Sequence, residues 1–234
     1  MLVGCTPAQY QAWWTSQGNP PLSEPQLSQS AAAATRYWAE VARQNRYRSS
    51  AQGISPTLAA RMAPSWRAGC PVPLSSLRYL RVSYMAFNGS ERTGELVVHA
   101  DQVAKVTAAF ELLWDANFRI ERMQLVDDFG GDDAASMAAN NTSAFNCRRV
   151  AGSSSWSQHS YGRAIDINPV QNPYVSGSSV SPPAGGAYLD RGNVRPGMIV
   201  AGDAAVRAFA SIGWGWGGAW ARTKDYQHFS ATGT

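Results

Sequence analysis

The 234-residue chain is poor in charge and in lysine, and it has no long apolar run. Charged residues make up 15% of it, and Lys105 and Lys224 are its only lysines, so arginine carries the net charge of +4. Without an apolar run of membrane-spanning length, a chain with 44% hydrophobic residues is expected to bury a substantial core and to have no transmembrane segment. The positive charge favours polyanionic partners, but no basic stripe with interleaved aromatics occurs. We therefore expect no nucleic-acid binding.

Several common catalytic motifs are also missing. There is no G-x-S-x-G, which leaves a serine hydrolase little support, and no H-E-x-x-H, which excludes the common zincin signature. Residues 213–218 match G-x-G-x-x-G, but only sixteen residues follow them, too few for the rest of a dinucleotide-binding unit. The aspartate-rich run 127–133 lacks the calcium-loop register. We assign it no metal and expect Asp133 to cap a short helix.

Histidines and aspartates near the C-terminus carry the clearest chemical signal. His159 and Asp166 lie seven positions apart in SQHSYGRAIDI, and Asp225 and His228 follow in KDYQHF. Two imidazoles and one carboxylate form a three-ligand set that suits zinc and leaves a fourth position open for water, as in a catalytic site. The chain is therefore predicted to be a metallohydrolase.

The residues around Asp166 predict a strand rather than a helix. Ile165 and Ile167 are β-branched and alternate with it, which predicts that both isoleucines enter the core while Asp166 faces a cleft. His159 precedes Gly162, and a sharp turn at this glycine would bring its ring back beside the carboxylate. Residues 213–220, which read GWGWGGAW, combine glycines that allow close backbone approach with flat apolar side chains. We expect them to form a groove beside the metal.

Together, these motifs resemble the M15 zinc peptidases, the VanY-like D-Ala-D-Ala carboxypeptidases and L-Ala-D-Glu endopeptidases that cut bacterial cell-wall peptides. The resemblance rests on S-x-H-x-x-G-x-A-x-D-I, W-G-G-x-W and D-x-x-H-F, and it covers residues 73–234. It implies that His159, Asp166 and His228 bind one zinc ion and that Asp225 is the catalytic acid and base. The implied activity is hydrolysis of peptidoglycan stem peptides.

The resemblance also implies further site residues. Arg148 has the position of the S-x-Y-R arginine in related peptidases and is the candidate partner of the oxyanion, a choice over the adjacent Arg149 that rests on the resemblance. Trp216, Trp220 and Tyr226 are candidate substrate-binding residues. The W-G-G-x-W segment is closer to that of the L-alanyl-D-glutamate endopeptidases, including phage endolysins, than to that of the dipeptidases.

Other interpretations of these residues stay open. Asp225 stands where family members often carry the longer glutamate, and it could be a mere partner of the ligands or a fourth zinc ligand. Arg148 could form a structural salt bridge. A lone histidine is more often hydrogen-bonded or at the surface than a ligand, so His99 is left out of the metal set. The alternative function is a non-catalytic, zinc-containing module that binds wall peptide or a protein partner.

The three cysteines bear on location. A disulfide between Cys70 and Cys147 would tie the entry of the domain to Arg148. Cys5 ends a Leu-Val-Gly-Cys sequence like that of a lipoprotein signal, which would allow a lipid anchor. The match is equally open to coincidence, because no basic and apolar segment precedes it, and a phage endolysin then fits better. Otherwise we expect an extracytoplasmic protein, secreted or attached to the envelope, and a monomer.

The expected organisation is an N-terminal extension over residues 1–72, a tether or packing segment with one helix at 29–45, followed by the zinc peptidase domain over 73–234. In that domain, strands are predicted at 77–84, 95–98 and 118–126, and helices at 101–116 and 203–211. This pattern indicates an α+β fold with a small antiparallel sheet carrying the zinc site, flanked by helices. The family resemblance implies a hedgehog/DD-peptidase-like domain.

Overall fold

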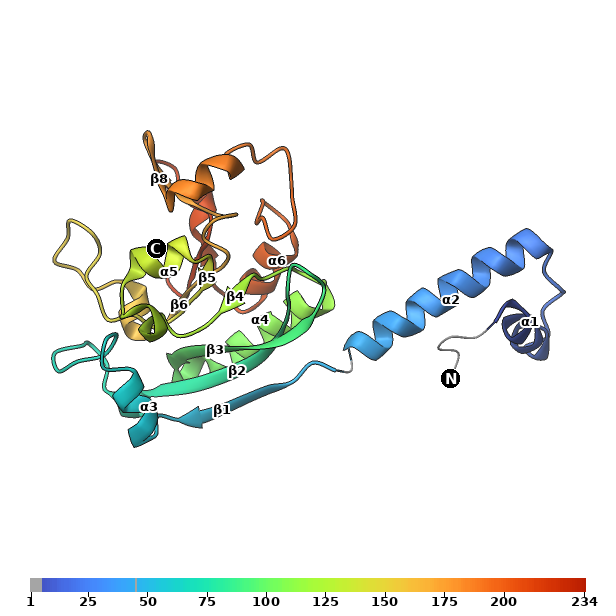
Figure 1. The fold of residues 1–234 in the computed structure, drawn as a ribbon, viewed down its shortest axis with the longest axis horizontal. Coiled ribbons are helices and arrows are strands. Elements are labelled where there is room, and N and C mark those ends of the chain that lie inside the picture. The colour runs from blue at the N-terminus through green and yellow to red at the C-terminus, as the bar shows by residue number, and fades with distance from the viewer. Residues whose placement is uncertain (1–5, 45) are drawn as a thin grey trace. The chain divides into compact units, whose positions relative to one another are not determined.

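The computed structural model describes residues 6–44 and 46–234, which form two compact units divided between Tyr47 and Arg48 (Figure 1). Cys5, the candidate lipid-anchor site, lies outside the described residues. No helix in the described ranges has both the length and the apolar character needed to cross a membrane.

The first unit is a pair of helices, α1 (Pro7–Ser16) and α2 (Glu24–Gln44). Thr6 caps α1 in a capping box, because its side chain accepts from the N–H of Gln9 while the Gln9 side chain accepts from the N–H of Thr6. The helix predicted at 29–45 corresponds to α2, which begins earlier, at Glu24.

The second unit begins with a three-stranded antiparallel sheet made of β1 (Ser49–Gly53), β2 (Leu77–Met85) and β3 (Glu91–His99), with β2 in the middle. The strands predicted at 77–84 and 95–98 correspond to β2 and to the second half of β3.

Residues 48–72 belong to this unit and not to the N-terminal extension, to which the sequence analysis assigned them. β1 pairs with β2 over its whole length, and the short helix α3 (Pro56–Arg61) buries Leu58 in a core cluster with Leu77 and Val97. All five β1 residues are exposed, so the strand lacks the apolar alternation by which its sequence would show it.

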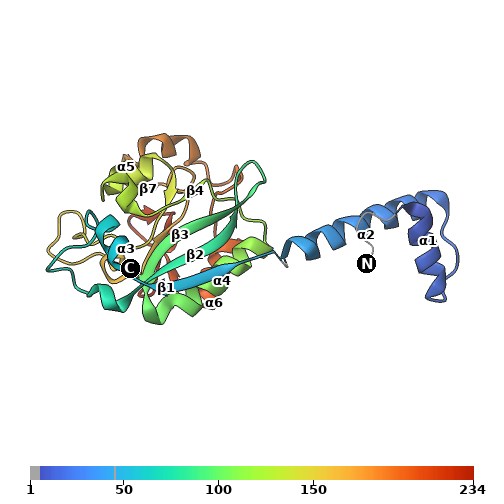
Figure 2. The same ribbon diagram turned by 60° about the horizontal axis from the view of Figure 1, so that its bottom comes forward.

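Two helices pack together beside this sheet, α4 (Val103–Asp115) against β2 and α6 (Ala204–Ser211) against α4 (Figure 2). Phe110 of α4 meets Phe209 of α6 edge to face, with ring centroids 6.2 Å apart. Both predicted helices are therefore present. The side chain of Asp203 caps α6 by accepting from the N–H of Val206.

The strand predicted at 118–126 is reduced to β4 (Arg122–Met123), which pairs in parallel with β5 (Asn141–Thr142). The strand is short because the side chain of Asn141 takes the next backbone donor, the N–H of Gln124, at 2.9 Å. Asp132, not the predicted Asp133, caps α5 (Asp133–Ala138), since its carboxylate accepts from the first free N–H groups of that helix.

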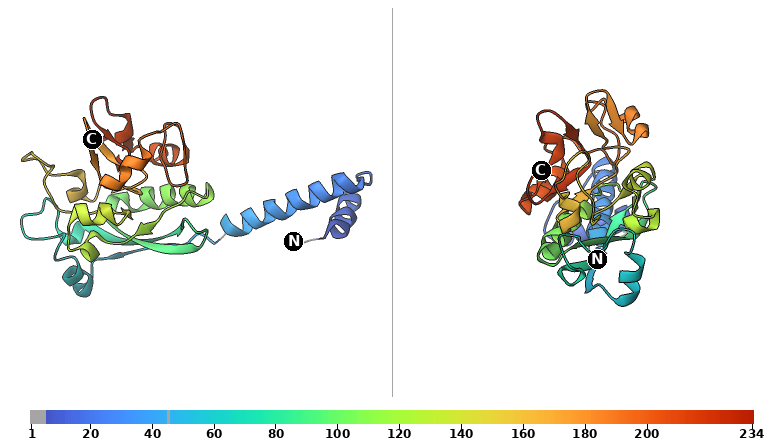
Figure 3. Two further views of the ribbon diagram at one scale, coloured as in Figure 1. Left: turned by 45° about the horizontal axis from the view of Figure 1, so that its top comes forward. Right: turned by 90° about the vertical axis from the view of Figure 1, so that its left-hand side faces the viewer.

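Two further small antiparallel sheets complete the domain (Figure 3). One has the order β6 (Ala164–Asp166), β11 (His228–Ser230), β9 (Gly215–Trp216), and the other the order β10 (Lys224–Asp225), β7 (Tyr174–Ser176), β8 (Ser179–Ser181). The short 3-10 turns are η1 (Leu74–Ser76), η2 (Ala100–Gln102), η3 (Val126–Phe129), η4 (Gln158–Tyr161), η5 (Pro183–Tyr188) and η6 (Gly217–Ala219). The mixture of helices and small antiparallel sheets agrees with the predicted α+β class.

Candidate metal centre

Strands β6 and β11 place an acid and a histidine directly opposite each other. In their antiparallel register Asp166 faces His228, and the next pair is Ile165 with Phe229. Both Ile165 and Phe229 are fully buried in the core, and because side chains alternate along a strand, Asp166 and His228 share the other face. The His228 Nδ1 lies 2.9 Å from the Asp166 Oδ1.

The turn η4 brings the second histidine to this pair. Ser157 caps the turn by accepting from the N–H of His159, and Gly162 ends it with φ 65°. A Cβ on Gly162 would lie 2.6 Å from the backbone nitrogen of His99, so the close approach to β3 needs glycine as much as the positive φ does. The His159 Nε2 consequently lies 3.1 Å from the Asp166 Oδ2.

The nitrogens of His159 and His228 that face Asp166 lie 3.3 Å from each other. Four-coordinate zinc has bonds of about 2.0–2.1 Å to nitrogen and oxygen, and tetrahedral geometry then sets its ligand atoms roughly 3.4 Å apart. The spacings among the three side chains are close to this value. In the described part of the chain, this buried trio is the one set of three or more His, Cys, Asp or Glu side chains placed to hold a metal ion.

A backbone group fixes the state of the His159 ring. Its Nδ1 lies 2.5 Å from the carbonyl oxygen of Ala144. Because a carbonyl only accepts, Nδ1 carries a proton, and Nε2 is therefore the nitrogen that the neutral ring would offer to a metal. The sequence does not predict this contact, because Ala144 contributes only its backbone carbonyl to it.

The charges around Asp166 favour its ionised form. Burial raises the pKa of Asp166, but the charge and hydrogen bonds of His159 and His228 outweigh burial and hold that pKa well below its usual range. Burial lowers the pKa of His159, and the attraction of Asp166 reverses this, so the net direction is upward. A buried carboxylate that draws in positive charge is suited to a divalent cation.

Asp225 is the second acid of the site, on β10. Its side chain is half-buried, and its Oδ1 is buried with no hydrogen-bond partner among the described residues. Burial, and next the negative charge of Asp166, raise the pKa of Asp225 to about 7. A carboxyl group with this pKa can both accept and donate a proton at neutral pH.

The two glycines of the W-G-G-x-W segment allow close packing against Asp225 and Trp216. A Cβ on Gly217 would lie 2.7 Å from the backbone oxygen of Asp225, and one on Gly218 would lie 2.2 Å from the ring of Trp216. The Trp216 indole N–H donates to the carbonyl oxygen of Tyr226 at 2.9 Å. A side chain at Gly217 would push this segment away from Asp225, and one at Gly218 would displace the Trp216 ring.

Of the predicted substrate-binding aromatics, Trp220 lies beside the trio, and Trp216 and Tyr226 lie beside each other. The Trp220 ring centroid is 5.7 Å from that of His228, and those of Trp216 and Tyr226 are 6.1 Å apart. On Tyr226 lies the guanidinium of Arg191, 4.4 Å from the ring centroid, a residue that the sequence analysis did not single out. All three aromatic side chains are half-buried, which leaves part of each exposed.

The two adjacent arginines have different surroundings. Arg148 lies near enough to the trio for its charge to lower the pKa of both His159 and Asp225, and it forms an ion pair of 2.9 Å with Asp133. Arg149 instead lies over Trp156, with its guanidinium carbon 3.6 Å from the ring centroid. The structure thus brings Arg148 toward the metal centre. Its partner Asp133 was missed, since nothing in the sequence relates the two residues.

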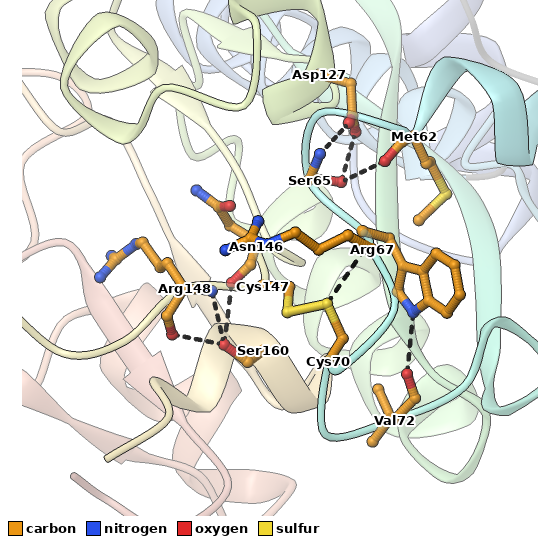
Figure 4. Close-up of a disulfide and its surroundings, with 11 residues drawn as sticks. Met62, Ser65, Arg67, Cys70, Val72, Asp127, Asn146, Cys147, Arg148 and Ser160 are labelled. Carbon is orange, nitrogen blue, oxygen red and sulfur yellow. Dashed lines mark hydrogen bonds between the residues drawn. A yellow bond between two sulfur atoms is a disulfide. The ribbon is translucent and has the colours of Figure 1, made fainter. Parts of the chain in front are cut away.

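A disulfide joins Cys70 to Cys147, immediately before Arg148 (Figure 4). The Cys147 N–H also donates to the carbonyl oxygen of Ser65 at 3.0 Å. The backbone of the next residue, Arg148, contacts Ser160: the Ser160 hydroxyl accepts from the Arg148 N–H and donates to the Arg148 carbonyl oxygen. The backbone of Arg148 is therefore fixed both to the first part of the domain and to η4.

The remaining polar candidates lie outside the metal group. His99 pairs with Asp101 at 2.7 Å. In the aspartate-rich run, Asp127 accepts from Ser65 and Asp128 pairs with Arg61. Protein donors thus occupy both carboxylates.

Comparison with known protein families gives a match to part of the chain. Residues 151–231, about a third of the chain, match the M15 peptidase family model described as D-alanyl-D-alanine carboxypeptidase. This segment contains the three predicted metal ligands and Asp225, whereas Arg148 and both disulfide cysteines precede it. No curated protein and no solved structure matches the chain.

Proposed function

We propose that the chain belongs to the M15 peptidases and is a zinc-dependent enzyme that hydrolyses peptidoglycan stem peptides. The observation that carries the proposal is the arrangement of Asp225, an acid with a buried, unpartnered oxygen, beside three buried side chains that converge as metal ligands. A module that only held a structural ion would have no use for such an acid. We also propose that the α+β domain is of the hedgehog/DD-peptidase-like type that the family resemblance implies.

His159, Asp166 and His228 would hold the zinc ion. Two neutral imidazoles and one carboxylate are a known catalytic donor type, and three protein ligands leave a coordination position open. The Ala144 carbonyl supports the assignment by fixing the tautomer of His159. When bound, zinc would supply a Lewis acid that polarises a carbonyl group and acidifies water.

The proposed proton carrier is Asp225. With a pKa raised to about 7 in the protein without metal, its carboxylate would take the proton of the attacking water and then pass it to the leaving amine. Arg148 would stabilise the negative charge that develops on the carbonyl oxygen of the substrate. The ion pair with Asp133 would hold the Arg148 side chain in place and would leave it able to donate to the substrate.

The substrate would lie along the aromatic side chains of Trp216, Trp220 and Tyr226. Either the L-Ala-D-Glu bond or the D-Ala-D-Ala bond would be cut, because both reactions use the same apparatus and differ in how the cleft accepts the chain beyond the scissile bond. Mass spectrometry of muropeptides after digestion of purified peptidoglycan distinguishes them. Free D-alanine would identify the carboxypeptidase, and newly exposed D-glutamate amines would identify the endopeptidase.

The location that fits this substrate is extracytoplasmic, with a phage endolysin as the alternative. The Cys70–Cys147 disulfide supports an oxidising environment for the folded protein, because such bonds persist mainly outside the reducing cytosol. The second candidate function is a zinc-containing binding module on the same fold. Zinc-loaded protein that binds peptidoglycan but releases no product from it would favour this module over the peptidase.

A further inference from the structure

A concavity of about 580 Å³ lies next to η4, the turn that carries His159. Gln158 and Tyr161 of η4 line it, while His159 itself points into the buried metal group. None of the three candidate metal ligands contributes to its wall. Two arginines do, Arg149 and Arg163, and these give the concavity its chemical character.

Arg149 is held flat against an aromatic ring. Arg149 and Trp156 face each other across an antiparallel bridge, which the hydrogen bond from the Val150 N–H to the Ser155 carbonyl at 2.9 Å extends into a small hairpin. The guanidinium stacks on the Trp156 ring at 3.6 Å. Stacking occupies the face of the guanidinium and leaves N–H groups on its edge for a planar acceptor.

The charge of Arg149 is not neutralised by an acid. One of its terminal nitrogens donates to the backbone carbonyl of Ser154, which is a neutral partner. Among the residues that the structure describes, no carboxylate lies within ion-pair distance of it. The wall that it shares with Trp156 therefore carries a positive charge that a ligand can match.

Arg163 is oriented by a chain of ionic contacts. One of its terminal nitrogens lies 2.5 Å from one oxygen of Asp101, and the other oxygen of Asp101 lies 2.7 Å from the Nδ1 of His99. Asp101 thus offsets the charge of Arg163 while fixing its position. Arg149, Arg163 and Asp101 together leave one net positive charge at the concavity.

We propose that this concavity binds a carboxylate of an acidic peptide through Arg149 and Arg163, with the rings of Trp156 and Tyr161 packing against the peptide. The guanidinium donors on its wall suit a carboxylate, which accepts hydrogen bonds from a guanidinium in its own plane. The inference rests on the proposed function only in naming the ligand class. An acidic wall peptide long enough to reach both places would be held at the concavity while one of its bonds lies at the metal centre.

The test is a binding titration of the full chain, monitored by NMR. It is carried out once with zinc bound and once with a chelator. The probes are the L-peptides acetyl-Ala-Glu-amide and acetyl-Ala-Gln-amide, which differ only in the carboxylate. We expect the acidic peptide to bind at least fivefold more tightly, with or without zinc, and to weaken as salt rises. Equal affinities, or binding that disappears when zinc is removed, would overturn the proposal. So would tighter binding of inorganic phosphate than of the acidic peptide.

Variants identify the side chains involved. Arg149→Gln should weaken binding of the acidic peptide at least fivefold and leave the amide unchanged, whereas Arg207→Gln, an exposed arginine on α6, should leave both unchanged. Arg163→Gln should act in the same direction. If losing the Asp101 contact prevents folding of that variant, Arg149→Lys still decides, because it keeps the charge but not the planar donors and should bind at an intermediate level.

An Arg149→Gln protein that binds the acidic peptide as tightly as the wild type refutes the assignment. The measurement needs no turnover. An inactive protein that still binds the carboxylate would contradict the peptidase and leave the second site intact. An active protein without this binding would do the reverse.

Discussion

Asp166 and His228 are separated by 62 residues in the chain and face each other across β6 and β11, with the Asp166 Oδ1 2.9 Å from the His228 Nδ1. Their position is fixed by backbone pairing, while the apolar partners Ile165 and Phe229 are locked in the core on the opposite face. The metal centre is thus part of the sheet. Changes to its ligands can be made without removing any core side chain.

Replacing a ligand should remove the metal. We expect His159→Ala to lose zinc, because two remaining protein ligands are too few to hold the ion stably. His99→Ala is the matched control, since His99 pairs with Asp101 outside the trio and its loss should leave zinc unchanged. The measurement is metal stoichiometry of the purified proteins by mass spectrometry. Zinc at wild-type stoichiometry in His159→Ala would contradict its role as a ligand.

Asp225 should separate metal binding from catalysis. We expect Asp225→Ala to retain zinc and to lose hydrolysis of purified peptidoglycan, with kcat lower by about 10²–10⁴, the range of general acid–base catalysis. Asp225→Asn keeps the size of the side chain and should be similarly impaired. If both variants hydrolyse peptidoglycan at the wild-type rate, Asp225 is not the proton carrier. Loss of zinc in either would instead make it a fourth ligand.

The ligand set and its strand follow from local sequence. The alternation of Ile165 and Ile167 with Asp166 predicts which side chain leaves the core, and Gly162 marks the turn that returns His159. These features depend on neighbours in the chain, where periodicity and turn chemistry act.

Long-range contacts did not follow from the sequence in the same way. The pairing of Asp133 with Arg148 depends on where the fold places the first residue of α5. Similarly, β1 is a strand only because β2 offers it a free edge. The five exposed residues of β1 have no apolar pattern, so only the partner strand determines their structure. For the same reason, the boundary predicted between residues 72 and 73 lies later than the division between Tyr47 and Arg48.

Arg148 should act on the rate rather than on metal binding. We expect Arg148→Ala to keep zinc and to lower kcat by about 10²–10³, the usual effect of removing one oxyanion donor. Asp133→Asn should cause a smaller loss, because it frees the Arg148 side chain without removing it. Steady-state kinetics on peptidoglycan fragments give both values. An unchanged kcat in Arg148→Ala would reduce the ion pair to a structural contact.

Asp225 should also affect the pH dependence of stability in the metal-free protein. Its pKa is raised from the ordinary value of 3.8 to about 7, so the folded state binds this proton more tightly than the unfolded state does. Its favourable contribution to the free energy of unfolding is full below pH about 4 and is lost as pH rises through about 7. Relative to Asp225→Asn, the chelated wild type should therefore lose stability between these values.

Urea unfolding with chelator at pH 5 and pH 8 measures this difference. A constant gap between wild type and Asp225→Asn would contradict the raised pKa. Zinc should reduce the pH dependence, because a nearby dication favours the ionised carboxylate.

The Cys70–Cys147 disulfide spans 77 residues and should stabilise the fold by restricting the unfolded chain. We expect Cys70→Ser to lower the free energy of unfolding by about 2–4 kcal/mol. Cys70→Ser/Cys147→Ser should lose about the same amount, since either change removes the same bond. Because Cys147 adjoins Arg148, kcat should fall as well, but by less than in Arg148→Ala. Urea unfolding and kinetics of these two variants give these values. A double variant as stable as the wild type would show that the contacts of Ser65 and Ser160 hold this segment without the disulfide.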